Sequence, residues 1–194
     1  MTTVSLSQLI EGARQGRVVS FPTDTVPALA VRPDRAASIF DLKQRSQNKP
    51  LILMGGDPED LWPYAIESTL EREIWQQVAQ TYWPGALTLV LPASDRLPEQ
   101  MNPTDPTTIG MRVPDCTIAR EILRQTGPLA TTSANRSGEP PLEDVASIDV
   151  AFPQVLTLSE VSEFPALGVP STVAKWTGRS WQILRQGAVE LREE

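Results

Sequence analysis

The sequence predicts an α/β fold: a single domain over residues 1–194, built on a twisted sheet that mixes parallel and antiparallel strands. Three observations support this prediction. The chain of 194 residues is long enough for one large domain with its own buried core. Strand-like and helix-like segments interleave along most of its length. Two strand-like segments near the end follow each other as in a hairpin, which favours a mixed sheet over a purely parallel one.

Helices and strands alternate through the first half of the chain. Apolar residues at helical spacing predict a helix that begins at Leu6 and ends near Gly16. The elements expected next are a strand at 18–21; a helix capped by Asp34 that carries Ile39, Phe40 and Leu42 toward Arg45; a buried strand at 50–54; a short helix at 60–64; and a helix at 70–82 with Ile74, Val78 and Tyr82 on its buried face. The Trp-Pro-Gly sequence at 83–85 ends that helix, because proline breaks helical hydrogen bonding.

The second half of the chain is richer in strands. Continuous apolar runs and alternating patterns predict strands there, bounded by turn residues. The expected strands are 86–91, 108–113, 128–132, 155–158, 171–176 and 181–184, with helices at 117–125 and 142–150. Residues 92–107 are rich in Pro, Asp and Thr and are expected to form a loop, and Gly178 lies in the turn between the last two strands.

The composition excludes several classes of mechanism. The chain has no histidine and one cysteine, so Ser-His-Asp triads, Cys-His dyads and zinc sites built from histidine or several thiolates are excluded. We therefore expect an enzyme of this composition to work through carboxylates, hydroxyls, lysine, arginine and backbone amides. No metal ligand from the protein is expected, and any Mg²⁺ is expected to arrive with a substrate.

Charge and hydropathy also restrict the partners. Seventeen basic and twenty-four acidic residues give a net charge of −7, which argues against nonspecific binding of nucleic acid by overall charge. No apolar run approaches the roughly 20 residues of a membrane span, and the first residues lack the pattern of a signal peptide. The single cysteine suits a reducing compartment, so a cytoplasmic protein without membrane contact is expected.

The segment VVSFPTDTVPAL at 18–29 carries the first candidate site. Pro22 marks the end of a strand, and Thr23, Asp24 and Thr25 follow at once. Open α/β sheets bind ligands at the carboxyl ends of their strands, so these oxygen-bearing side chains are candidates for ligand contact. A polar turn after a buried strand is the alternative interpretation.

Cations gather at the end of the second predicted helix. Lys43 and Arg45 lie in its last turn and Lys49 follows four residues later. Such residues are ordinary partners of a helix dipole, and they are equally suited to bind a polyphosphate together. Neither a P-loop nor a G-x-G-x-x-G sequence is present, so a nucleotide would be held in another way.

Two more segments place polar residues at strand ends. Alternation along 108–112 puts Thr108, Gly110 and Arg112 on one face of a strand, where Arg112 requires either a bound anion or a structural ion pair. The sequence SANRSG at 133–138 is either a turn or a nest for an anion or a nucleobase edge. Segments 170–172 and 184–187 repeat the pattern of small polar residues or one arginine at a strand end.

These motifs together resemble one family. The motifs are PTDTV at 22–26, LKQR at 42–45, KPL at 49–51, WPGALTLVL at 83–91, IGMRVP at 109–114, TSANRSG at 132–138, PSTV at 170–173 and LRQG at 184–187. They are similar, in the same order, to the motifs of the Sua5/YrdC/YciO family, and the length is that of the short YrdC type. The resemblance covers nearly the whole chain.

The resemblance implies helices flanking the sheet around a large concave cleft. It also implies L-threonylcarbamoyladenylate synthase activity, a nucleotidyltransferase reaction in which L-threonine, bicarbonate and ATP, with Mg²⁺, give threonylcarbamoyl-AMP and pyrophosphate for the t⁶A modification of tRNA. Downstream threonylcarbamoyl-transferase proteins are the implied partners. The alternative is a YciO-like protein, associated with RNA or the ribosome, that binds nucleotide or double-stranded RNA without synthase activity.

The family's functional residues fall on matching positions of this chain. The resemblance assigns threonine binding to Thr25, Arg112 and Ser171, and phosphate contacts to Lys43, Arg45 and Lys49, of which Lys43 and Arg45 are the candidate catalytic residues. It assigns the remaining nucleotide contacts to Thr108, Ser133, Asn135 and Arg185. The chain departs from the family at four positions: Pro27-Ala28 replaces tyrosine-glycine, Ser46 replaces proline, and Met54 stands where histidine is common. We expect Pro27 and Met54 to reshape the amino-acid pocket.

Overall fold

The computed structural model describes residues 2–66, 69–159 and 167–191. Its strands are β1 (Thr3–Val4), β2 (Val19–Phe21), β3 (Ala28–Val31), β4 (Ile52–Met54), β5 (Leu87–Pro92), β6 (Thr108–Arg112), β7 (Leu129–Ser133), β8 (Leu156–Leu158), β9 (Thr172–Trp176) and β10 (Trp181–Arg185). Its α-helices are α1 (Leu6–Arg14), α2 (Ala37–Lys43), α3 (Thr69–Tyr82), α4 (Thr117–Thr126) and α5 (Val145–Ala151). Short 3₁₀ helices cover Pro33–Arg35, Pro58–Asp60, Trp62–Tyr64 and Glu99–Met101.

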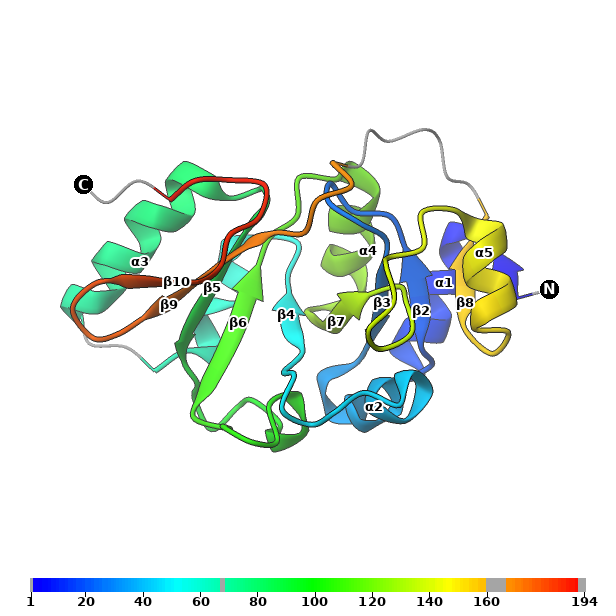
Figure 1. Cartoon of the computed structure of the whole chain (residues 1–194), viewed down its shortest axis with the longest axis horizontal. Helices are drawn as coiled ribbons and strands as arrows, with labels where there is room; N and C mark the ends of the chain where they lie inside the picture. Colours follow the sequence, from blue (N-terminus) through cyan, green and yellow to red (C-terminus); the bar gives the residue numbers. More distant parts are fainter. Residues whose placement is uncertain (1, 67–68, 160–166, 192–194) are drawn as a thin grey trace.

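The strands of the described residues form one continuous sheet in the order β1-β8-β2-β3-β7-β4-β6-β5-β9-β10. Pairs β1/β8, β2/β8, β4/β6 and β5/β9 are parallel and the other pairs are antiparallel. The first and last strands are therefore the two edges, and the sheet runs along the longest dimension of the molecule (Figure 1). The predicted mixed α/β fold is confirmed.

Two large apolar clusters hold the helices on this sheet. Trp75 of α3 and residues of α2 pack with the buried side chains of β5 and β6, such as Leu89 and Met111. At the other end of the sheet, α1 and α4 pack together against β2 and β8 (Figure 1). A smaller cluster places Ile148 of α5 against Leu29 of β3. Burial of this much apolar surface is the main force that fixes the fold.

Most predicted elements are present within a residue or two. Helix α1 starts at a capping box formed by Ser5 and Gln8, which satisfies the free amides of its first turn. Two strands were missed. β1 has only two residues, and β3 is a short strand that begins directly after the polar loop ending at Pro27.

Two details of the predicted helices were wrong. Asp34 does not cap α2, because it lies in a preceding 3₁₀ turn and pairs with Arg32 at 2.9 Å. The buried face of α3 is rotated by one residue: Trp75 and Ala79 are buried, whereas Ile74 is 40% exposed. The indole ring of Trp75 meets Trp176 of β9, and this contact sets the rotation of the helix. Val78 and Tyr82 are partly buried, as predicted.

Candidate functional site

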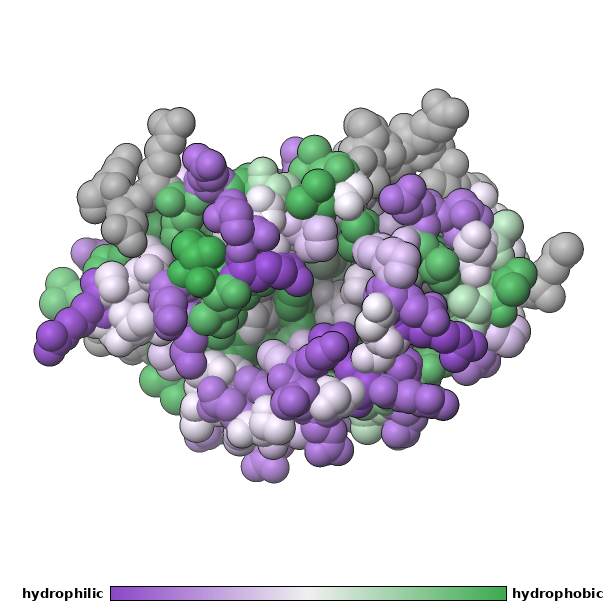
Figure 2. Space-filling model, viewed as in Figure 1, coloured by the Kyte–Doolittle hydropathy of each residue, from purple (hydrophilic) through white to green (hydrophobic). Residues whose placement is uncertain are grey.

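A cavity of about 690 Å³ lies over one face of the central strands. Its lining comes from β3, β4, β5, β6, β7, β9 and β10 and from the loops beside them. Figure 2 shows the molecule hollowed near the middle of this face, with hydrophilic residues along the border of the hollow. Any ligand in this cavity would therefore contact side chains from most strands of the sheet.

The strand register divides the cavity into two ends. In β4 and β6, Met54 pairs with Arg112, and the next cavity-facing pair is Ile52 with Gly110. Gly110 also pairs with Val90 of β5, and Val90 pairs with Lys175 of β9. Moving along the strands from Arg112 toward Thr108 therefore leads from one end of the cavity to the other. The alternation predicted for Thr108, Gly110 and Arg112 is confirmed, because all three line the cavity.

The inner end of the cavity consists of Thr25, Thr88, Arg112 and Ser171. All four line the cavity and each is at least 95% buried. They come from the β2–β3 loop, β5, the end of β6 and the residue before β9. Segments that lie far apart in the sequence thus meet at one point of the fold.

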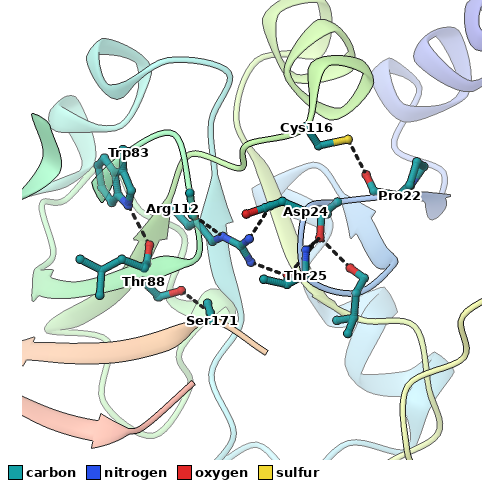
Figure 3. A network of polar contacts seen from close by, with 12 residues as sticks. Pro22, Asp24, Thr25, Trp83, Thr88, Arg112, Cys116 and Ser171 are labelled. Carbon is teal, nitrogen blue, oxygen red and sulfur yellow. Dashed lines mark hydrogen bonds and ion pairs between the residues drawn. The ribbon is translucent and has the colours of Figure 1, made fainter. Parts of the chain in front are cut away.

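Arg112 is the centre of the inner end (Figure 3). Its Nε donates to the Gly85 carbonyl at 2.9 Å, one terminal nitrogen donates to Thr25 Oγ1 at 2.8 Å, and the other pairs with Asp24 at 2.5 Å. Burial lowers the pKa of Arg112, and the charge and hydrogen bond of Asp24 oppose that effect. These contacts use three of the five guanidinium N–H groups, so two remain to meet a ligand.

The ion pair of Arg112 with Asp24 is the structural alternative that the sequence left open. It does not remove Arg112 from the cavity, because Arg112 still lines it and has two N–H groups without an acceptor among the described residues. A guanidinium held by fixed partners is preorganised to bind a carboxylate through parallel hydrogen bonds. The structural ion pair and ligand binding are therefore compatible.

The loop that carries Thr25 is fixed by its own hydroxyls. Thr23 Oγ1 donates to the Val26 carbonyl at 2.7 Å and accepts from the Thr25 amide at 3.2 Å. From outside the loop, the amides of Leu167 and Gly168 donate to the carbonyls of Asp24 and Thr25. Thr25 Oγ1 is thereby held where Arg112 can donate to it.

Ser171 and Thr88 form the other wall of the inner end. Their hydroxyls lie 2.8 Å apart, and Arg185 of β10 donates to the Ser171 carbonyl at 2.8 Å and to its hydroxyl at 3.3 Å. Gly187 lies so close to the backbone of Pro170 and Ser171 that a Cβ there would overlap both. The motifs at 170–173 and 184–187 therefore lock together, and this contact positions Ser171.

The outer end of the cavity consists of Arg45, Lys49, Asp105 and Lys175. Arg45 Nε donates to the Lys49 carbonyl at 2.9 Å, and its terminal nitrogen donates to the Pro50 carbonyl at 3.1 Å. Burial lowers the pKa of Arg45. Thr108 lies between the two ends and donates to the Asp105 carboxylate at 3.0 Å.

Lys43 and Asn135 do not line the cavity. Lys43 is 97% buried, and its ammonium group donates to the Ser133 carbonyl at 2.5 Å and to Asn135 Oδ1 at 3.2 Å. Burial, together with the nearby charges of Arg45 and Lys49, lowers the pKa of Lys43 to about 7. Lys43 thus ties the end of α2 to the end of β7, where its acceptors include Thr132 and Ser133 of the cavity lining.

Most of the predicted site residues meet at this cavity. Those that line it are Thr25, Arg45, Lys49, Thr108, Arg112, Ser133, Ser171 and Arg185, while Lys43 and Asn135 contact Ser133 without lining the cavity. Of the positions that depart from the family, Pro27, Ala28 and Met54 line it and Ser46 does not. Thr88 and Lys175 were not predicted, although strand alternation from Val90 and from Ser171 could have placed both on the cavity face.

The described residues contain no cluster of three or more His, Cys, Asp or Glu side chains that could hold a metal ion. None of the described helices is both long enough and apolar enough to cross a membrane. The polar side chains of the cavity lining are hydroxyls, amides, cations and one carboxylate, and this set suits a ligand that carries several negative charges.

Comparison with known proteins gives consistent matches. The family model for Sua5, YciO and YrdC proteins, described as "Telomere recombination", matches residues 11–187. A threonylcarbamoyl-AMP synthase of Vibrio campbellii is 32% identical over 187 residues, which cover 94% of this chain and 99% of the relative.

Solved structures show the same fold. P. abyssi Sua5 in complex with L-threonine superposes with a TM-score of 0.83 at 31% identity, covering 94% of this chain and 54% of the Sua5 chain. E. coli YciO superposes with a TM-score of 0.82 at 24% identity, covering 95% of this chain and 90% of YciO. The chain thus corresponds to about half of the longer Sua5 protein.

Proposed function

The chain belongs to the Sua5/YciO/YrdC family, and from this premise we propose that it is a threonylcarbamoyl-AMP synthase. The reaction takes L-threonine, bicarbonate and ATP and gives threonylcarbamoyl-AMP and pyrophosphate. One observation carries the proposal: the three positions assigned to threonine, Thr25, Arg112 and Ser171, converge at the inner end of a cavity whose outer end is cationic.

Each end of the cavity suits one substrate. At the inner end, the free N–H groups of Arg112 would bind the carboxylate of threonine, and the hydroxyls of Thr25 and Ser171 would hold its polar atoms. At the outer end, Arg45 and Lys49 would bind the phosphates of ATP. Mg²⁺ would enter with ATP and neutralise part of the phosphate charge.

The chemistry needs positioning more than proton transfer by the protein. Bicarbonate condenses with the threonine amine, which forms a C–N bond and releases water. An oxygen of the resulting carbamate attacks the α-phosphorus, the bond from that phosphorus to the bridging oxygen breaks, and pyrophosphate leaves with the electron pair. Holding the reactants together and stabilising charge are effects that cations and hydroxyls supply, so the absence of histidine is no obstacle.

Lys43 would act as a positioning residue in this scheme. Its hydrogen bonds fix Ser133 and Asn135, and Ser133 lines the cavity. The product would pass to downstream threonylcarbamoyl-transferase proteins that modify tRNA, and a cytoplasmic location would suit that transfer.

The test is pyrophosphate release by the purified protein with ATP, Mg²⁺, bicarbonate and L-threonine. Release should depend on threonine and on bicarbonate, and labelled bicarbonate should appear in a product that also contains AMP. Arg112→Lys should strongly reduce release, whereas Arg179→Ala should not, because Arg179 is exposed and lies outside the cavity. If no threonine-dependent release occurs where a known synthase is active, and the protein instead shifts duplex RNA in a salt-dependent way, the RNA-binding alternative stands.

A further inference from the structure

We propose that Lys175 binds the β- and γ-phosphates of ATP and the pyrophosphate that leaves. This inference rests on the proposed function for the direction of the reaction. It assigns a ligand to a cation that no motif of the family resemblance includes.

Strand β9 places Lys175 on the cavity face. Ser171, Val173 and Lys175 alternate along this strand and all line the cavity. Lys175 pairs with Val90, which is level with Gly110 in the middle of β6. Four residues of extended strand separate Lys175 from Ser171, a distance of roughly 13 Å. Lys175 is therefore far from the threonine site but still inside the same cavity.

The ammonium group of Lys175 is unengaged. Among the residues that the structure describes, none accepts a hydrogen bond from it or forms an ion pair with it. Asp105 carries the one carboxylate of the lining, and it accepts hydrogen bonds from Thr107 at 2.5 Å and from Thr108 at 3.0 Å. These hydrogen bonds lower the pKa of Asp105, and the charge of Lys175 adds the smallest contribution. These contacts keep Asp105 on its own loop, so the charge of Lys175 is left for a ligand.

The charge of the cavity favours a polyanion. Five cationic side chains and one carboxylate line it, in a protein whose net charge is −7. Arg112 is paired with Asp24, whereas the other four cations have no carboxylate within ion-pair distance among the described residues. Three of these, Arg45, Lys49 and Lys175, lie at the outer end, and the fourth, Arg185, contacts Ser171 of the inner end. Like charges at one site repel, and a polyphosphate would relieve that repulsion.

The geometry of in-line displacement then determines which phosphates Lys175 contacts. The attacking oxygen and the leaving oxygen lie on opposite sides of the phosphorus. Because the carbamate is built at the inner end, the leaving pyrophosphate must point away from it, toward the outer end. There Lys175 approaches from β9, and Arg45 and Lys49 approach from the loop between α2 and β4.

The experiment is titration calorimetry with inorganic pyrophosphate, AMP and L-threonine as separate probes. The proteins are the unaltered chain, Lys175→Gln, Lys175→Arg, and the control Arg179→Gln, which removes an exposed arginine three residues beyond the strand. We expect Lys175→Gln to weaken pyrophosphate binding about tenfold, the size of one charge-assisted hydrogen bond. AMP and threonine binding should change less than twofold. Lys175→Arg should retain most of the affinity.

The outcomes separate this inference from the proposed function. Undetectable pyrophosphate binding by the unaltered chain, or equal binding by Lys175→Gln, would overturn the inference. An equal loss for pyrophosphate, AMP and threonine would overturn it as well, since that pattern indicates a general structural defect. Selective loss of pyrophosphate binding in a protein without synthase activity would keep the polyphosphate site and refute only the synthase.

Discussion

The two ends of the cavity hold their charges in different ways. At the inner end, Arg112 is 96% buried and is bound to Gly85, Thr25 and Asp24. At the outer end, Lys49 is exposed, and Lys175 has no ion pair among the described residues. The inner end is therefore preorganised for one carboxylate in one orientation, whereas the outer end can follow a flexible polyphosphate. Selectivity for the amino acid and neutralisation of the phosphate charge are therefore assigned to opposite ends of the same strands.

The largest effect should come from Arg112→Ala. Removing the guanidinium leaves the Asp24 carboxylate, only 11% exposed, without its ion-pair partner. Breaking a buried pair in this way costs about 3–5 kcal/mol of stability, measured by urea unfolding. In calorimetry, threonine binding should weaken by about 2–5 kcal/mol.

Arg112→Lys serves as the milder variant, because it keeps the charge and loses the forked geometry. Should Arg112→Ala fold and bind threonine as tightly as the unaltered chain, the inner end would not be the carboxylate site. The inner end would then not differ from the outer end in its preorganisation for a carboxylate.

Gly187→Ala tests whether the interlocked motifs position the inner end. The new methyl group would overlap the backbone of Pro170 and Ser171, so that segment must move. We expect a loss of about 1–3 kcal/mol in unfolding free energy and weaker threonine binding. Gly178→Ala is the control: Gly178 has a φ of +89° and open space around it, so its substitution should lower stability without changing threonine affinity. Equal threonine affinity in both variants would contradict the positioning role of Gly187.

Lys43 allows a test by pH. In the folded protein its pKa is about 7, below the ordinary 10.5, so the unfolded chain binds more protons between these two values. The free energy of unfolding must therefore rise with pH in that window. The cost of burying the charged form of Lys43 is fully present below pH 7. Relative to Lys43→Met, the unaltered chain should gain unfolding free energy between pH 7 and 9.5. A constant difference between the two proteins over that range would show that Lys43 is not desolvated.

The smallest effect should come from Asp105→Asn at the outer end. Removing the one carboxylate of the lining raises the positive potential around Lys175. Pyrophosphate should bind about twofold more tightly at low salt, as for two unit charges roughly 10 Å apart in water. The gain should vanish at high salt because of screening, and threonine affinity should stay constant. A gain that persists at high salt would point to a change of loop structure instead.

The residues of the site could be predicted from the sequence more completely than the contacts between them. Strand-end motifs are local, so Thr25, Arg112 and Ser171 could be chosen from sequence, and strand alternation placed Thr108 and Arg112 on the same face. The pairing of Arg112 with Asp24 joins residues 88 positions apart, and its geometry depends on the β2–β3 turn. Local patterns do not contain that information.

The errors have physical causes of the same kind. The rotation of α3 depends on the contact of Trp75 with Trp176, which lies on a distant strand. Periodicity alone could equally place Ile74 inside. The phosphate contact expected for Lys43 stays a prediction, and its hydrogen bond to the Ser133 carbonyl joins residues 90 positions apart, which local patterns do not reveal.

The contact of Gly187 with Ser171 also bears on synthesis of the protein. A chain made from its N-terminus exposes Thr25 early and completes Arg112 later, but Ser171 is fixed only after Arg185 and Gly187 have left the ribosome. Contacts between residues far apart in the sequence slow folding. The threonine site therefore cannot be complete before residues up to Gly187 have been synthesised.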